Sequence, residues 1–405
     1  MKRRHLLATV ASAAVCAGRA RAADRPVKIG VLTDMSGLYA DATGRGGVLA
    51  ARMAAEDYAA AAGGPSAEVV FADHQNKPDV GAGIARQWLD RDGVDVIVEV
   101  INSSVALAVS AVVREKNKAV LFSGASSADL TGKACSPNSV AWTYDTYMLA
   151  ATTARGVLEA GSKTWFNLVS DYAFGHTMED QVRAIVEESG GKIAGEVSTP
   201  LGTSDFSSYL LQAQASGAQA IGLVNAGGDT INSIKQAVEF GLTRGKQRLV
   251  AFVIYLTDVH AMGLETAQGL QFTTGWYWNL NESTVAWARR FAARNGGAFP
   301  TQLQAGNYSA VLHYLKVVGA GALREDGQAV VAAMKRMPTD DPLFGRCTIR
   351  EDGRMMHNVY LCQVRAPGES RIPWDYYRVL KTIPSARAWR PLDEGFCPLV
   401  KAAAR

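Results

Sequence analysis

Histidine and cysteine are scarce in this chain, with six histidines and five cysteines among 405 residues. None of them has the spacing of a zinc site such as Cys-x-x-Cys or His-Glu-x-x-His. The P-loop signature and the Gly-x-Ser-x-Gly nucleophile elbow are also missing, and the glycine-rich stretch 44–49 lacks the third glycine of a dinucleotide fingerprint. We therefore expect no metal, no cofactor and no catalytic residues.

Long apolar runs are lacking as well. The run Leu6–Ala17 follows the basic segment Met1–Arg4 and precedes Ala20-Arg21-Ala22, which is the pattern of a cleaved export signal. It is shorter than the ~20 residues that span a bilayer. We expect residues 1–22 to be removed, by general secretion or by the twin-arginine route, and no stable membrane insertion afterwards. Val15 before Cys16 argues against a lipid anchor.

Charge of one sign does not dominate the mature chain. The full sequence has a net charge of +4, but residues 1–22 hold five basic residues and no acidic one. Their removal leaves 37 basic against 38 acidic residues, a net charge of −1. A balanced surface offers no electrostatic footprint for nucleic acid. We therefore expect an exported protein with no nucleic-acid partner.

Four cysteines remain after the leader is removed, an even number in an oxidising compartment. We favour a disulfide between Cys135 and Cys397, because a long irregular tail needs a covalent tie. Cys347 and Cys362 flank a turn between two strand-like runs, so they could staple a hairpin. The alternative is that these two are merely small buried apolar residues.

The body of the chain alternates short apolar runs with amphipathic helical segments, which predicts βαβ units and parallel sheets. The alternation starts at Val27–Leu32, passes a turn-rich stretch at Trp142–Tyr147 and then begins again. The predicted fold class is therefore α/β, with two doubly wound parallel-sheet bodies. A hairpin of Phe344–Arg350 with Met355–Val364 follows, and from Ala366 the chain is expected to be irregular.

Small polar residues follow two neighbouring strands in the first body. Asn102, Ser103 and Ser104 come after one strand, and Gly124, Ala125 and Ser126 come after the next. Ligands of open α/β sheets bind outside the carboxyl ends of the strands, and a helix N-terminus favours an anion. The pair of loops predicts a carboxylate site built from neutral dipoles. Ordinary helix capping is the alternative for either loop alone.

Aromatic residues supply an apolar lining for such a site. The candidates near the loops and crossings are Tyr39, Tyr144, Tyr147 and Phe174, whereas Trp276 and at least one of Tyr277 and Trp278 are expected in the core. Asp258 could meet a ligand cation or cap the short helix after it. Asn225, which follows the strand-like run Ala220–Val224, completes the candidate set.

Three segments resemble periplasmic solute-binding proteins of the leucine/isoleucine/valine-binding type. They are Val27–Tyr39, Ser123–Thr131 and Asp171–Gly175, and the similarity runs in order from Val27 to about Val364. The resemblance implies two lobes joined by a three-crossing hinge, with the ligand closed between them and handed to the permease subunits of an ABC importer in the periplasm. The implied division is residues 24–142 with 279–342, residues 143–278 with 343–378, and an irregular tail at 379–405.

The resemblance also assigns roles. It implies that groups at Ser104, Gly124 and Ser126 hold the ligand carboxylate, that Phe174 faces the ligand and that Asp258 takes an ammonium. Amino-acid binders tend to carry an aromatic residue where this chain has 226–228, Ala-Gly-Gly, so we expect an enlarged pocket. The set resembles a subgroup associated with aromatic carboxylates. A hydrophobic amino acid as ligand, and a sensor in place of a transport component, remain alternatives, and a monomer is expected.

Overall fold

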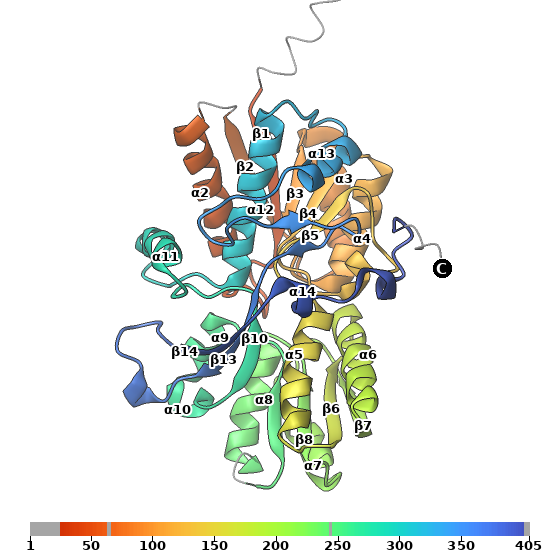
Figure 1. Ribbon diagram of the computed structural model, residues 1–405, viewed down its shortest axis with the longest axis vertical. Coiled ribbons are helices and arrows are strands. Elements are labelled where there is room, and N and C mark those ends of the chain that lie inside the picture. The colour runs from red at the N-terminus through yellow and green to blue at the C-terminus, as the bar shows by residue number, and fades with distance from the viewer. Residues whose placement is uncertain (1–24, 63–65, 243–244, 401–405) are drawn as a thin grey trace, which may run out of the picture.

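A computed structural model describes residues 25–62, 66–242 and 245–400. The expected signal peptide, residues 1–22, lies outside these ranges. The described chain forms two lobes, one above the other in Figure 1. Each lobe is built on a parallel sheet, so the predicted fold class is confirmed. No helix in the described ranges is long and apolar enough to cross a membrane.

The first lobe contains a sheet in the order β2-β1-β3-β4-β5. Its central strands are buried apolar runs, as expected for a sheet covered on both faces. The strands are β1 (Val27–Thr33), β2 (Ala67–Asp73), β3 (Val96–Glu99), β4 (Ala119–Phe122) and β5 (Ser139–Ala141). The helices are α2 (Gly44–Ala62), α3 (Pro78–Gln87), α4 (Ser103–Glu115), α11 (Glu282–Arg294), α12 (Gln302–Gly319) and α13 (Gly327–Arg336).

The second lobe contains a parallel sheet in the order β7-β6-β8-β9 and an antiparallel sheet in the order β10-β13-β14. Its strands are β6 (Thr164–Ser170), β7 (Lys192–Thr199), β8 (Ala220–Val224), β9 (Arg248–Ala251), β10 (Gln271–Thr274), β13 (Val359–Val364) and β14 (Tyr377–Ile383). Its helices are α5 (Thr146–Glu159), α6 (Ala173–Glu188), α7 (Ser207–Ala215), α8 (Gly228–Glu239), α9 (Leu256–Met262) and α10 (Leu264–Ala267).

The expected hairpin near residue 350 is shorter than predicted. Only β11 (Thr348–Ile349) and β12 (Met355–Met356) pair with each other. The chain then crosses from the first lobe to the second at His357, and β13 pairs with β10 and β14 instead. The sequence pattern of Met355–Val364 is continuous, but the lobe boundary divides it. It is the third crossing, after those that follow β5 and β10.

The prediction of an irregular segment from Ala366 is wrong for β14, a seven-residue strand. Only its first residue, Tyr377, is buried, so the strand lacks the alternation that would reveal it in the sequence. The Cys135–Cys397 disulfide is confirmed. Cys347 is half-buried and Cys362 is buried, and both are free thiols, so the hairpin staple does not form.

Candidate functional site

The two small-residue loops of the first lobe lie side by side, because they follow the adjacent strands β3 and β4. The side-chain oxygen of Asn102 accepts from the N–H groups of Ser104 and Val105, at 3.0 and 3.2 Å, and so caps α4. The Ser103 hydroxyl accepts from the Ser127 N–H at 3.2 Å. Asn102 and Ser103 therefore hold the loops together, and two of the helix N–H groups expected to meet an anion are already engaged.

Ser104 reaches the second lobe. Its hydroxyl accepts from the backbone N–H of Ala173, the first residue of α6, at 3.2 Å. Nearby, the hydroxyl of Ser127 is 3.0 Å from that of Thr177, one turn along α6. The loops that follow β3 and β4 in the first lobe thus bond directly to the start of a helix in the other lobe. Both contacts depend on the lobes being closed.

Ser126 and Gly124 adjoin a pair of buried tyrosines. Tyr144 donates from its hydroxyl to the Gly124 carbonyl at 2.8 Å, and that hydroxyl is 2.9 Å from the one of Tyr255. Burial raises the pKa of Tyr144 to about 12, and hydrogen bonds from Tyr255 and Ser126 reduce the rise. The Gly124 N–H donates to the Glu99 carbonyl at 3.1 Å, so this amide is not free to bind a carboxylate. Ala125, beside it, is buried.

A second tyrosine pair lies at the same boundary. The hydroxyl of Tyr39, from the loop after β1, meets that of Tyr172, which directly precedes α6. Phe174 is buried and its ring centroid lies 5.7 Å from that of Tyr172. Burial raises the pKa of both tyrosine hydroxyls above the ordinary value of 10. Both therefore remain neutral hydrogen-bonding groups at physiological pH.

We call the six residues that meet at this boundary the interlobe layer. They are Tyr39, Ser104, Ser126, Tyr144, Tyr172 and Tyr255. Their side chains are uncharged hydroxyls, each able to donate and to accept a hydrogen bond. Such a layer can hold a carboxylate by neutral donors, and the tyrosine rings provide apolar surface beside it.

The expectation that residues 226–228 enlarge the pocket is wrong. Gly227 has a φ of 60°, and a Cβ there would lie 2.6 Å from the Leu38 carbonyl oxygen and 2.8 Å from the Tyr39 ring. The Gly228 N–H donates to that same carbonyl at 3.2 Å. The space left by the missing side chains is therefore filled by the first lobe when the lobes close.

The remaining candidates have local partners. The amide of Asn225 bonds the hydroxyls of Ser233 and Thr230, both on α8, at 3.2 and 2.8 Å. Asp258 accepts from the Tyr255 N–H at 2.9 Å and so caps α9. Burial raises the pKa of Asp258 to about 7. Tyr147 is half-buried and packs against the apolar cluster of the second lobe.

Two residues of the interlobe layer were missed in the sequence. Tyr172 and Tyr255 each lie within three positions of a candidate, Phe174 or Asp258, but nothing in the spacing shows that their hydroxyls point to the other lobe. Asp229, at the start of α8, is also buried, and burial raises its pKa to about 6. Trp276, Tyr277 and Trp278 are all buried in the core, as expected for at least two of them.

The fold and the interlobe layer together define a two-lobed binding protein. A family model described as periplasmic binding protein matches residues 26–369, and the chain belongs to that family. The family resemblance seen in the sequence is confirmed.

Several relatives cover nearly the whole chain. A periplasmic binding protein from Burkholderia mallei is 48% identical, with a TM-score of 0.89 and coverage of 93% of this chain and 99% of that one. A branched chain amino acid ABC transporter periplasmic ligand-binding protein from Burkholderia xenovorans is 42% identical, with a TM-score of 0.81 over 92% and 99%. Leu/Ile/Val-binding protein homolog 6 of Brucella melitensis is 26% identical over 84% of this chain and 87% of its own.

Proposed function

We propose that the protein is the substrate-binding component of an ABC importer, which captures a small carboxylate between its lobes by hinge closure and performs no reaction on it. The observation that carries this proposal is the interlobe layer, in which hydroxyl groups from both lobes meet at one boundary. A ligand that contacts both lobes favours the closed state. Moving such an equilibrium from mostly open to mostly closed takes roughly 5 kcal/mol of differential affinity.

The ligand class that suits this layer is an aromatic or hydrophobic acid. The buried rings of Tyr39, Phe174 and Tyr255 supply apolar surface, and an apolar ring buried against them gains roughly 25 cal/mol per Å². The carboxylate would accept from the hydroxyl of Ser126, because the Tyr144 hydroxyl already donates to the Gly124 carbonyl. Neutral hydroxyls suffice to bind the carboxylate, because hydrogen bonds to an ionised group are about twice as strong as those between neutral groups.

Calorimetry with benzoate and with L-leucine as probes tests this assignment, after native mass spectrometry has identified any acid that co-purifies. Ser126→Ala should weaken the affinity for whichever probe the wild type binds by roughly tenfold to a hundredfold, because one hydrogen bond to a charged group is lost. The control is Ser110→Ala, a buried serine on α4 beside Cys135 and Pro398. Equal affinity of wild type and Ser126→Ala would remove Ser126 from the site.

A hydrophobic amino acid is the second candidate. It is supported by the description of the Burkholderia xenovorans relative and by the buried carboxyl of Asp258 next to Tyr255. Asp258→Asn separates the two. An ammonium-bearing ligand should lose at least about 2 kcal/mol of binding free energy without the carboxylate, whereas a simple carboxylate should bind as well or better. Asparagine keeps an oxygen that can accept from the Tyr255 N–H and so preserves the cap.

The proposed location is the periplasm, after cleavage of residues 1–22, and the proposed state is a monomer. The mass of the protein recovered from a periplasmic extract tests the cleavage, and light scattering tests the monomer. Uptake of the identified acid by cells with and without the gene distinguishes a transport component from a sensor. A sensor would leave uptake unchanged.

A further inference from the structure

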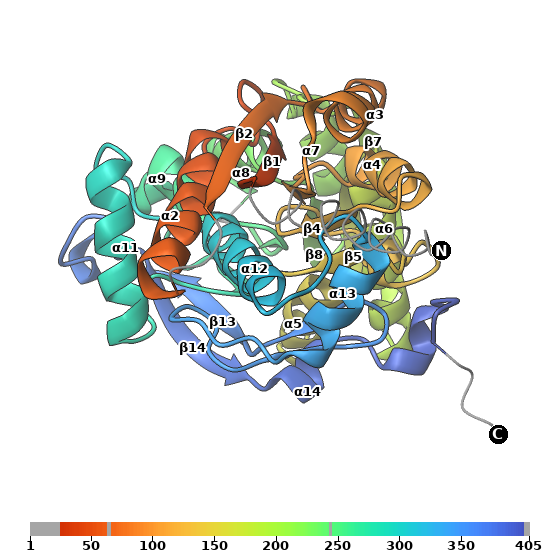
Figure 2. The ribbon, with the colours of Figure 1, turned by 90° about the horizontal axis from the view of Figure 1, so that it is seen from above.

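The chain continues beyond the second lobe after β14. After β14 the chain forms the short helix α14 (Ser385–Ala388), passes the hinge at Trp389 and reaches the first lobe. Figure 2 shows β13, β14 and α14 along one side of the molecule, opposite α3. Cys397 is then bonded to Cys135, which precedes β5 of the first lobe. The two ends of this segment, which we call the C-terminal strap (residues 384–397), are therefore fixed on different lobes.

The strap is packed into the hinge at Trp389. The Trp389 indole donates to the His357 carbonyl at 3.0 Å, and its ring lies 4.5 Å below the guanidinium of Arg354. Arg354 is fully buried and donates to the Tyr144 carbonyl at 2.9 Å. Its Nη1 is also ion-paired with Asp145 at 3.4 Å, whereas its Nε and Nη2 have no hydrogen-bond partner, so the face of the Trp389 ring adds to the stabilisation of this buried cation. Trp389 thus contacts the third crossing at His357, and Arg354 connects it to the first crossing at Tyr144.

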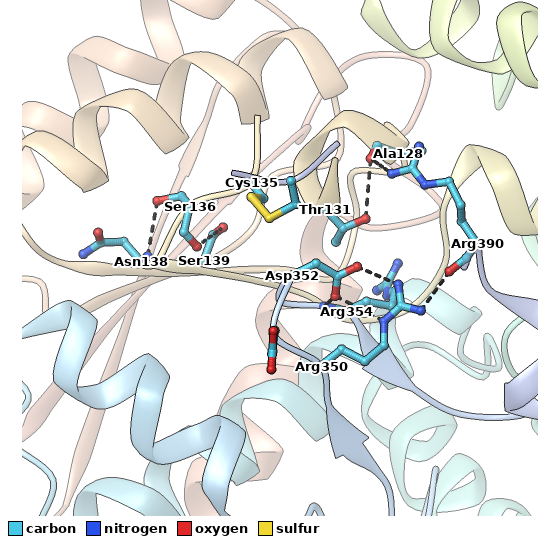
Figure 3. The surroundings of a disulfide bond; sticks show 12 residues. Ala128, Thr131, Cys135, Ser136, Asn138, Ser139, Arg350, Asp352, Arg354 and Arg390 are labelled. Carbon is cyan, nitrogen blue, oxygen red and sulfur yellow. Dashed lines mark hydrogen bonds and ion pairs between the residues drawn. A yellow bond between two sulfur atoms is a disulfide. The ribbon is translucent and has the colours of Figure 1, made fainter. Parts of the chain in front are cut away.

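Beyond Trp389 the strap bonds to the first lobe. The Arg390 guanidinium donates to the Ala128 carbonyl at 3.0 Å, at the end of the ligand loop 123–128. In turn, Arg350 donates to the Arg390 carbonyl at 2.8 Å and is ion-paired with buried Asp352. Figure 3 shows these contacts beside the disulfide. Trp389, which packs into the hinge, and Arg390, which bonds to the first lobe, are therefore consecutive residues of the strap.

We infer that the C-terminal strap is a fourth connection between the lobes, and that it limits how far they open. Three crossings alone leave the lobes free to rotate about the hinge. A covalent tie between positions 262 residues apart removes the open arrangements that would separate Cys135 from the strap. Opening also has to disturb the packing of Trp389 between Arg354 and His357. The strap therefore raises the fraction of closed protein without touching the ligand.

The experiment measures the distance between the lobes in the protein without added ligand. Fluorophores are attached to p-acetylphenylalanine at Leu323 in the first lobe and Leu211 on α7, both exposed. Single-molecule energy transfer is compared between wild type, the double variant Cys135→Ser with Cys397→Ser, and Arg390→Gln. The control is Cys347→Ser, which removes a free thiol and leaves the strap intact. Thermal unfolding checks that each variant is folded.

We expect the open population to rise roughly threefold to tenfold in the disulfide variant, and by a smaller factor in Arg390→Gln. Arg390→Gln keeps the disulfide, so it remains informative if the double variant fails to fold. Distance distributions identical to wild type in the folded variants would overturn the inference. Affinity for benzoate is a second readout that rests on the proposed function. If wild type binds no carboxylate, the proposed function fails while the distance measurement still decides the role of the strap.

Discussion

Tyr39 and Tyr172 meet hydroxyl to hydroxyl across the boundary between the lobes, although they are 133 residues apart in the chain. Each hydroxyl is buried, and each is the partner that keeps the other satisfied. The contact can form only when the lobes are closed, because the two residues follow strands of different sheets, β1 and β6. The closed state is thus favoured by protein–protein hydrogen bonds as well as by any ligand.

Phenylalanine at Tyr39 or at Tyr172 should reduce closure. Each single change leaves the partner hydroxyl buried without a bond, which costs about 1 kcal/mol, or roughly a fivefold fall in the closed-to-open ratio. The double variant should lose little more than either single one, because the interaction is already absent. Energy transfer between labels at Leu211 and Leu323 measures the ratio, with Tyr209→Phe on α7 as the control. Strictly additive effects would show that the two hydroxyls act independently.

Substitutions at Gly228 test whether steric contact between the lobes controls closure. A Cβ at this position would lie 3.2 Å from the Leu38 Cβ, and the three heavy atoms nearest to it all belong to Leu38 of the first lobe. Gly228→Ala should oppose closure slightly, and Gly228→Val by about 1–3 kcal/mol, as in other overpacked contacts. The control is Gly156→Ala in α5, where a Cβ has no neighbour within 4 Å. Benzoate affinity and interlobe distance should change together in the Gly228 series, and unchanged distances would exclude the contact.

Alanine substitutions at Ser103 and Ser104 should have different effects, although the two residues are adjacent. Ser104→Ala removes the acceptor for the Ala173 N–H and should shift closure by about 1 kcal/mol. Ser103→Ala removes the acceptor for the Ser127 N–H inside the first lobe and should lower the free energy of unfolding by a similar amount. Urea unfolding measures the second effect and energy transfer the first. A Ser104→Ala protein that closes normally would contradict the role given to that hydroxyl.

The buried carboxyl of Glu99 should make the free energy of unfolding depend on pH. It lies buried at the end of β3, and its carboxyl contacts the Thr33 hydroxyl and accepts from the Asn307 amide at 3.1 Å. Burial raises its pKa to about 8, so the folded protein favours the neutral form. This contribution to stability is complete below the ordinary pKa near 4.5 and is lost as the pH rises to about 8.

The Glu99→Gln variant isolates this carboxyl, because Glu179 and Asp258 also have raised pKa values. The difference in unfolding free energy between wild type and Glu99→Gln should change by roughly 1 kcal/mol per pH unit between pH 5 and 8, in favour of the variant as the pH rises. Urea titrations at pH 5, 6, 7 and 8 provide the measurement. Parallel curves for the two proteins would show that Glu99 does not titrate in this range.

Local patterns in the sequence predicted the architecture well. Buried apolar runs such as Val27–Thr33 indicate parallel strands, and the alternation with helices fixes two α/β bodies. The disulfide between Cys135 and Cys397 was also predicted, on the argument that a long irregular tail needs a covalent tie. The edge strand β14 was missed because its exposed residues carry no period.

The sequence by itself determined most of the secondary structure, the two bodies and the loops that follow β3 and β4, because each depends on neighbours close in the chain. Only the tertiary structure decided which side chains meet across the boundary. Tyr39 faces Tyr172, and Gly227 makes room for Leu38, because closure brings together segments far apart in sequence. Hydroxyl and glycine residues have many local uses, so no pattern in one segment reveals a partner in the other lobe.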